Sequence, residues 1–177
     1  VCTMLMAAVA FTAGCGGEKK SDKKVLKVGM ECAYAPYNWS QTKADGGAVK
    51  IAGSNEYAYG YDVMMAKKLA DSMGADLEIH KIEWDGLAPA VVSGKIDAAI
   101  AGMSITSKRK ETVDFTKPYY YATVVALVKK DSEQAKAQSV ADLKGSVATS
   151  QLNTIWYDQI DQVPDVKKLP AIDTVPG

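Results

Sequence analysis

The chain has 177 residues, of which 47% are hydrophobic and 24% are charged. This length and composition suit one folded domain and part of a second, and they exclude a chain that is disordered as a whole. The 21 basic and 21 acidic residues balance to a net charge of zero, so there is no broad positive surface for a nucleic-acid partner. An anionic ligand would have to be recognised by a few local residues.

Residues 1–14 are typical of an export signal. They carry no charge and are too short for a membrane span of about 20 residues. Thr12-Ala13-Gly14-Cys15 resembles a bacterial lipobox, in which the signal is removed before a cysteine that then carries lipid. The sequence therefore predicts a partial lipoprotein signal over 1–14, then a lipidated Cys15 and a flexible, charged tether over 15–24. An ordinary signal peptide with a chance cysteine is the alternative.

From Val25 onward, strand patterns alternate with helix patterns. Short apolar runs predict buried strands over residues 25–30, 76–81 and 96–102. Apolar residues at helical spacing predict helices over residues 61–74 and 85–94. Strands that alternate with helices in this way form a right-handed α/β unit around a parallel sheet.

Both predicted helices carry start and stop signals. Asp62 and Asp85 are the expected N-caps, because a short acidic side chain can accept hydrogen bonds from the free N–H groups of a first turn. Gly74 and Gly94 are the expected C-terminal stops. The segment 40–60, which precedes the first helix, contains several turn residues, and we expect an extended surface hairpin or loop there.

The pattern changes after the third strand. Residues 119–128 predict a strand that leaves the first α/β unit, and a polar surface stretch follows. Further along, we expect a short helix, a strand and a second helix, over residues 140–145, 146–150 and 153–160.

Two loops are the candidate site, because ligands of open α/β sheets bind beyond the carboxyl ends of the strands. These loops follow the first and third strands, over 29–39 and 101–109. The second loop combines the bare backbone of Gly102 with the hydroxyl of Ser104 and the guanidinium of Arg109. Such a set is suited to holding the carboxylate and the ammonium of a free amino acid.

Residues 25–153 resemble the solute-binding receptor of a bacterial amino-acid ABC transporter, a type II periplasmic binding protein of the polar amino-acid group. The resemblance is carried by YAPYNW (34–39), GYDVMMAKKLA (60–70), WDGLAPAVVSGKIDAAIAGMSITSKRKETVDFTKPYY (84–120) and SVADLKGSVATSQLNT (139–154). It implies two α/β lobes that are joined by a hinge and close on the ligand. We expect lobe 1 over 25–127, then the hinge and an incomplete, C-terminally truncated lobe 2 over 128–177.

The resemblance also assigns roles to residues. Arg109 matches the guanidinium that holds the ligand carboxylate. Tyr34 and Trp84 match aromatic walls around the ligand side chain, and Glu31 matches an acid at its far end, which hints at a basic or amide side chain. The complete set of expected ligand-binding residues is Glu31, Tyr34, Trp84, Gly102, Met103, Ser104, Arg109 and Thr154.

Structural roles for several of these residues stay open on the sequence alone. Trp84 can belong to the core, Glu31 can pair with a nearby lysine, and Ser104 can cap a turn. Thr106 is expected to cap the helix that carries Arg109 rather than to bind ligand. Asn153 stands where the family pattern has glycine, before Thr154 at the start of a helix whose N–H groups face the ligand.

The function that the resemblance implies is an extracytoplasmic receptor without enzymatic activity. It would be anchored by its N-terminal lipid to the outer face of the cytoplasmic membrane, capture a free polar or basic L-amino acid, and deliver it to an ABC permease. We expect no cofactor and no metal, because no metal-ligand cluster surrounds His80 and no phosphate loop is present. The alternatives are a prephenate or arogenate dehydratase-like enzyme, with Glu31 as general acid, and the ligand-sensing lobe of a signalling receptor.

Overall fold

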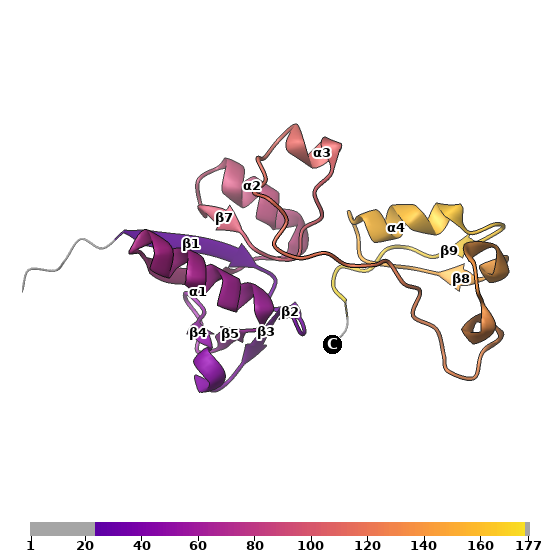
Figure 1. Ribbon diagram of the computed structural model, residues 1–177, viewed down its shortest axis with the longest axis horizontal. Helices are drawn as coiled ribbons and strands as arrows, with labels where there is room; N and C mark the ends of the chain where they lie inside the picture. Colours follow the sequence, from indigo (N-terminus) through magenta and orange to yellow (C-terminus); the bar gives the residue numbers. More distant parts are fainter. Residues whose placement is uncertain (1–23, 176–177) are drawn as a thin grey trace, which may run out of the picture.

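The computed structural model describes residues 24–175 (Figure 1). The predicted export signal and Cys15 lie outside them. Figure 1 shows a larger N-terminal lobe, from β1 to α3, and a smaller C-terminal lobe with α4, β8 and β9; extended chain connects the two. Among the described residues, no helix combines the length and the apolar character that a membrane crossing requires.

A parallel three-stranded sheet forms the centre of the N-terminal lobe, in the order β6-β1-β7. β1 (Val25–Met30) and β6 (Asp76–Lys81) pair along their whole length, and they confirm the predicted strands residue for residue. The third strand, β7 (Ala98–Ala99), is shorter than the predicted 96–102. The apolar run still packs inward at Ile96 and Ala101, which are 1% and 3% exposed. The apolar pattern therefore predicts which residues are buried, but not how many of them pair with β1.

The segment between β1 and the first helix forms a second, antiparallel sheet. Its strand order is β2-β3-β5-β4, which confirms the expected surface hairpin over 40–60. The elements are β2 (Ala33–Tyr34), β3 (Asn38–Gln41), the 3₁₀ turn η1 (Asp45–Gly47), β4 (Val49–Lys50) and β5 (Tyr57–Tyr59).

The first helix, α1 (Tyr61–Met73), ends as predicted at Gly74, which has the left-handed φ of 63°. The prediction that Asp62 caps its start is wrong. Gly60 is the N-cap of the helix. Asp62 lies inside the first turn, and its side chain is 0% exposed. Its carboxylate accepts hydrogen bonds from other parts of the lobe, which are described below.

The second helix, α2 (Leu87–Val92), follows the 3₁₀ turn η2 (Trp84–Gly86). Asp85 lies within η2 and makes no capping hydrogen bond, so its predicted role as N-cap is also wrong. Its carboxylate accepts instead from the side chain of Asn153, in the other lobe. The core of the N-terminal lobe lies between the central sheet and the two helices, where Val28, Ile79, Val63 and Leu87 are 0% exposed.

Residues 119–128 run extended but form no strand with any described residue, so the predicted strand is wrong. An apolar, β-branched sequence becomes a strand only when a neighbouring strand satisfies its backbone groups. Here the apolar side chains stay exposed, at 82% for Tyr121 and 99% for Leu127.

The C-terminal lobe consists of short elements. The 3₁₀ helix η4 and the strand β8 stand where a short helix and a strand were predicted, and β8 pairs in parallel with β9. The elements from α3 onward are α3 (Ser107–Lys110), η3 (Glu133–Lys136), η4 (Val140–Leu143), β8 (Val147–Ala148), α4 (Ile155–Gln159), η5 (Ile160–Gln162) and β9 (Lys167–Lys168).

Candidate functional site

A cavity of about 250 Å³ lies between the two lobes. The N-terminal lobe provides an indole, a thioether and a guanidinium, and the C-terminal lobe provides an amide. The lining residues are Trp84, Asp85, Ala88, Met103, Arg109 and Asn153. Three of the predicted ligand-binding residues, Trp84, Met103 and Arg109, therefore meet around one space.

Arg109 is partly buried in this cavity. Its Nη1 donates to the carbonyl of Ser104 at 2.7 Å, and its Nη2 donates to the carbonyl of Asn153 at 2.9 Å. The guanidinium carbon lies 5.3 Å from the centre of the Trp84 ring, in cation–π geometry. Removal from water lowers the pKa of Arg109, and Asp158 opposes that shift. Among residues 24–175 the guanidinium forms no ion pair, so its charge is available to an anion.

The local sequence explains where the guanidinium lies. Thr106 is the N-cap of the short helix α3, and its Oγ1 accepts from the Arg109 N–H at 3.1 Å. This confirms the predicted capping role of Thr106. The cap fixes the backbone of Arg109 within the first turn of α3, and the Arg109 side chain points back along the chain to the Ser104 carbonyl.

Asn153 is the main contact from the C-terminal lobe. Its carbonyl accepts from both Arg109 and Trp84 Nε1, and its Nδ2 donates to Asp85 at 2.9 Å. Its φ of 54° lies in the left-handed region, where asparagine ranks next to glycine. The departure from the glycine of the family pattern therefore preserves the backbone shape.

Thr154 is buried and faces its own lobe. It is the N-cap of α4: its Oγ1 accepts from the Tyr157 N–H at 3.3 Å and donates to the Gln151 carbonyl at 2.7 Å. The side chain therefore shapes the turn that presents Asn153, and it does not line either cavity between the lobes.

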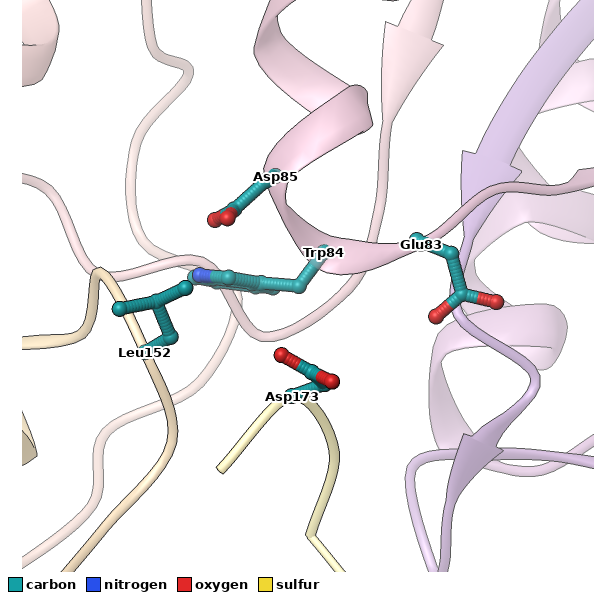
Figure 2. A pocket seen from close by; sticks show the side chains of 5 residues that line it. All are labelled: Glu83, Trp84, Asp85, Leu152 and Asp173. Atoms are coloured by element: carbon teal, nitrogen blue, oxygen red, sulfur yellow. The ribbon is translucent and has the colours of Figure 1, made fainter. Parts of the chain in front are cut away.

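A second cavity of about 240 Å³ adjoins the same tryptophan (Figure 2). Three of its lining residues, Glu83, Asp85 and Asp173, carry carboxylates, and the other two are Trp84 and Leu152. Figure 2 shows the Asp85 and Asp173 carboxylates on opposite sides of the Trp84 indole. An aromatic plane among carboxylates is chemically suited to a cationic group.

Glu31 is 6% exposed and lies next to this acidic region. Its Oε1 accepts from Gln151 Nε2, which reaches across from the other lobe at 2.8 Å. Desolvation raises the pKa of Glu31, the Gln151 hydrogen bond lowers it, and Glu83 and Asp85 add to the increase. The alternative that Glu31 pairs with a lysine is not what the structure shows: in the described part of the chain Glu31 has no ion-pair partner.

The remaining predicted residues surround the loop after β7. Gly102 has a φ of 63°, and a β-carbon there would come within 3.8 Å of the Tyr34 ring. Its N–H donates to Tyr119 Oη at 2.9 Å. The Gly102 carbonyl and the Ser104 hydroxyl make no hydrogen bond with any residue of the described range, so both can serve a ligand.

Sequence reasoning missed several residues that shape the site. The sequence around Asp85 indicates a helix cap rather than a contact with the other lobe, and the crossing contact of Gln151 has no local signal because it joins residues 120 positions apart. The asparagine at 153 did carry a signal, since Asn before a helix start is typical of a left-handed turn. The ligand-binding roles of the eight predicted residues remain a prediction.

Two α/β lobes with a charged, aromatic cavity between them define a two-lobed ligand-binding protein. Comparison with family models agrees: the model of the bacterial extracellular solute-binding proteins, family 3, matches residues 26–168. The chain belongs to this family, and its fold is that of the type II periplasmic binding proteins.

Individual relatives give the same result. The chain is 32% identical over 160 residues to the arginine-binding extracellular protein ArtP of Bacillus subtilis (strain 168); the match covers 88% of this chain and 56% of the relative. An ancestral arginine-binding protein bound to glutamine superposes with a TM-score of 0.70 at 33% identity, over 86% of this chain and 61% of that one. The ancestral amino acid-binding protein AncCDT-1, a precursor of cyclohexadienyl dehydratase, gives a TM-score of 0.69 at 32% identity, over 85% and 61%. The chain thus spans little more than half the length of ArtP.

Proposed function

We propose that this protein is a receptor that captures a free polar or basic L-amino acid outside the cytoplasm and delivers it to an ABC permease. The observation that carries the proposal is the setting of Arg109. Its guanidinium lines a cavity between the lobes and stacks on Trp84, and within residues 24–175 its hydrogen-bond partners are neutral carbonyls. A ligand carboxylate would replace a carbonyl partner with a charged one, which strengthens the hydrogen bonds.

The ammonium and the side chain of the ligand have separate partners in this proposal. The free Gly102 carbonyl and Ser104 hydroxyl would accept from the ammonium. The carboxylates of Glu83, Asp85 and Asp173 would attract a cationic side chain to the face of Trp84. The names of ArtP and of the ancestral arginine-binding protein support the same ligand class.

The location of the receptor is part of the proposal. Family 3 is described as extracellular, and the predicted lipid on Cys15 would hold the protein at the outer face of the cytoplasmic membrane. The segment between Cys15 and β1 would act as the tether. Replacement of Cys15 by serine should move the protein from the membrane fraction to the medium or periplasm.

An enzyme on the same scaffold is the second candidate, and the buried Glu31 favours it. A carboxyl group whose pKa is raised by burial is suited to general acid catalysis. One solved neighbour is the precursor of a dehydratase, although its title describes it as an amino acid-binding protein. Incubation with prephenate or arogenate should yield no product if the protein is a receptor, and product formation would favour the enzyme.

Calorimetric titration of the full-length protein with each of the twenty amino acids and cystine tests the main proposal. We expect tight binding of arginine or lysine and no binding of aspartate or glutamate. Binding of a small neutral amino acid alone would contradict the assignment of the acidic region. If the protein binds none of arginine, lysine, histidine, glutamine and cystine, the proposed ligand class is refuted.

A further inference from the structure

A chain of four hydrogen bonds joins the two site loops through the interior of the N-terminal lobe. Asp62 is at its centre: Oδ2 accepts from Asn38 Nδ2 at 2.7 Å, and Oδ1 accepts from Tyr119 Oη at 2.8 Å. On one side, Asn38 Oδ1 accepts from the Cys32 N–H at 2.9 Å. On the other, Tyr119 Oη accepts from the Gly102 N–H at 2.9 Å. The chain therefore begins in the loop after β1 and ends in the loop after β7.

The electrostatics of Asp62 set it apart from an ordinary core residue. Its side chain is 0% exposed, and in the range 24–175 it has no ion-pair partner. A buried carboxylate without a cation costs stability unless hydrogen bonds compensate for the lost water. Desolvation raises the pKa of Asp62, and the donors on Asn38 and Tyr119 lower it. Both donors point at the carboxylate, so every member of the chain is satisfied, and satisfied buried networks fix geometry.

The two ends of the chain are backbone groups with special conformations. Cys32, which follows Glu31, has a φ of 56°, and Gly102 has a φ of 63°. The loop 102–104 is held at both ends, because the Ser104 carbonyl accepts from Arg109. The hydrogen bond from the Gly102 N–H to Tyr119 holds the peptide that joins residues 101 and 102, so this end of the loop cannot move away from Tyr119 without breaking that bond.

Tyr119 also starts the extended segment 119–128 that leaves the lobe. Its ring stacks on Tyr61 with centroids 6.2 Å apart, and Tyr61 Oη donates to its carbonyl at 3.1 Å. The same residue therefore fixes the Gly102 loop and the point where the connection to the other lobe begins.

We propose that Asp62 and Tyr119 are positioning residues of the ligand site: they hold the loops 31–34 and 102–104 at the separation that one bound amino acid spans. The inference rests on the proposed function for its effect on affinity. The coupling of Asp62 to the N–H groups of Cys32 and Gly102 does not depend on the proposed function, and a separate measurement tests it.

The test compares Tyr119→Phe with Tyr121→Phe in the full-length protein. Tyr119→Phe removes only the hydroxyl that joins Asp62 to Gly102 and leaves the ring in place. Tyr121→Phe makes the same chemical change two residues further on, at a side chain that is 82% exposed. Asp62→Asn is a second variant: it keeps the shape but leaves one of the two donors, Asn38 Nδ2 or Tyr119 Oη, facing an NH2 group. Circular dichroism first identifies a temperature at which every variant is folded.

Two measurements at that temperature decide the inference. Amide hydrogen exchange should become faster at Gly102 by about tenfold in Tyr119→Phe, and at both Gly102 and Cys32 in Asp62→Asn. Calorimetry with arginine should show an affinity loss of about fivefold or more in both variants, and a change below twofold in Tyr121→Phe.

The outcomes separate this inference from the proposed function. If the wild type binds arginine and both variants bind it within twofold of wild type, the positioning role is refuted. Unchanged exchange at Gly102 in Tyr119→Phe refutes it whatever the affinities are. If the wild type binds none of the amino acids, the proposed function fails, and faster exchange at the two amides still establishes the coupling.

Discussion

Arg109 shows how a single charge is kept ready for a ligand. A guanidinium that pairs with an internal carboxylate loses most of its attraction for an outside anion, whereas one held by carbonyl oxygens keeps its full charge. Arg109 has two carbonyl partners and the face of Trp84. These contacts fix its direction and leave its charge uncompensated by any acid within ion-pair distance in the described residues.

The first prediction concerns this residue. Arg109→Ala should reduce amino-acid affinity at least about tenfold, because each charge-assisted hydrogen bond contributes about 1.5–3 kcal/mol. Arg109→Lys should recover part of the loss, since lysine keeps the charge but not the planar fork. Calorimetry measures both, with Lys110→Ala, at an exposed neighbouring position, as the control. A change below twofold in Arg109→Ala would remove this residue from the site.

Glu31 gives a prediction about pH. Burial raises the pKa of its carboxyl above the ordinary value of 4.5, so the folded protein holds this proton more tightly than the unfolded chain does. The contribution of Glu31 to stability is therefore greatest below pH 4.5 and is lost as the pH rises through the raised pKa. Glu31→Gln should flatten the decline in stability above pH 4.5 and raise the melting temperature at pH 7. Thermal unfolding without ligand measures this, and a lower melting temperature at pH 7 would contradict it.

At the scale of elements, the turn before α4 places Asn153 against the other lobe. Asn153 and Asp165 both have left-handed φ values, 54° and 51°, without being glycine. Only Asn153 contacts Arg109 and Trp84; the salt-bridge partner of Asp165 is Lys144, within the C-terminal lobe. The two positions thus share a backbone strain and differ in their relation to the site.

This pair gives a matched test. Asn153→Ala and Asp165→Ala should each lower the free energy of unfolding by about 1 kcal/mol, because alanine tolerates the left-handed region poorly. Only Asn153→Ala should also weaken amino-acid binding, since it loses the hydrogen bond to Asp85 and loosens the carbonyl that faces Arg109. Chemical denaturation and calorimetry measure the two effects. Equal affinities in the two variants would show that the turn is not part of the site.

The elements also show what the sequence can predict. β1, β6 and α1 follow directly from their apolar spacing, because these patterns report which face is buried and both strands have partners along their whole length. Residues 119–128 have an equally apolar pattern and form no strand. Burial patterns are local, whereas ladder partners are not, so a strand prediction is weakest where the neighbour lies in another part of the chain.

The residues of the site also differ in how far the sequence predicts them. Loops at the carboxyl ends of the strands were predictable from topology, and with them Trp84, Met103 and Arg109, which line one cavity. The contacts from Gln151 and Asn153 depend on how the two lobes meet. No local pattern specifies that arrangement, so these partners of Glu31 and Arg109 could be found only in three dimensions.

At the scale of the whole molecule, the connection between the lobes is exposed over most of its length. Residues 119–128 are extended and unpaired within the described range, and the lysines that follow, Lys129 and Lys130, are exposed. Trypsin binds extended substrates, so brief digestion should cut after these two lysines before it cuts after the helical Lys67 or Lys68. Mass spectrometry of the first fragments checks this, and initial cleavage within α1 would contradict it.

Four hydrogen bonds join the lobes around Trp84 and Glu31. Water can replace each of them when the lobes separate, so the bond from Trp84 contributes about 0.5–1.5 kcal/mol and each bond that involves a charged group about 1.5–3 kcal/mol. The balance between apposed and separated lobes therefore depends on a small number of polar contacts. A dissolved molecule that touches both sides can shift this balance with modest binding energy.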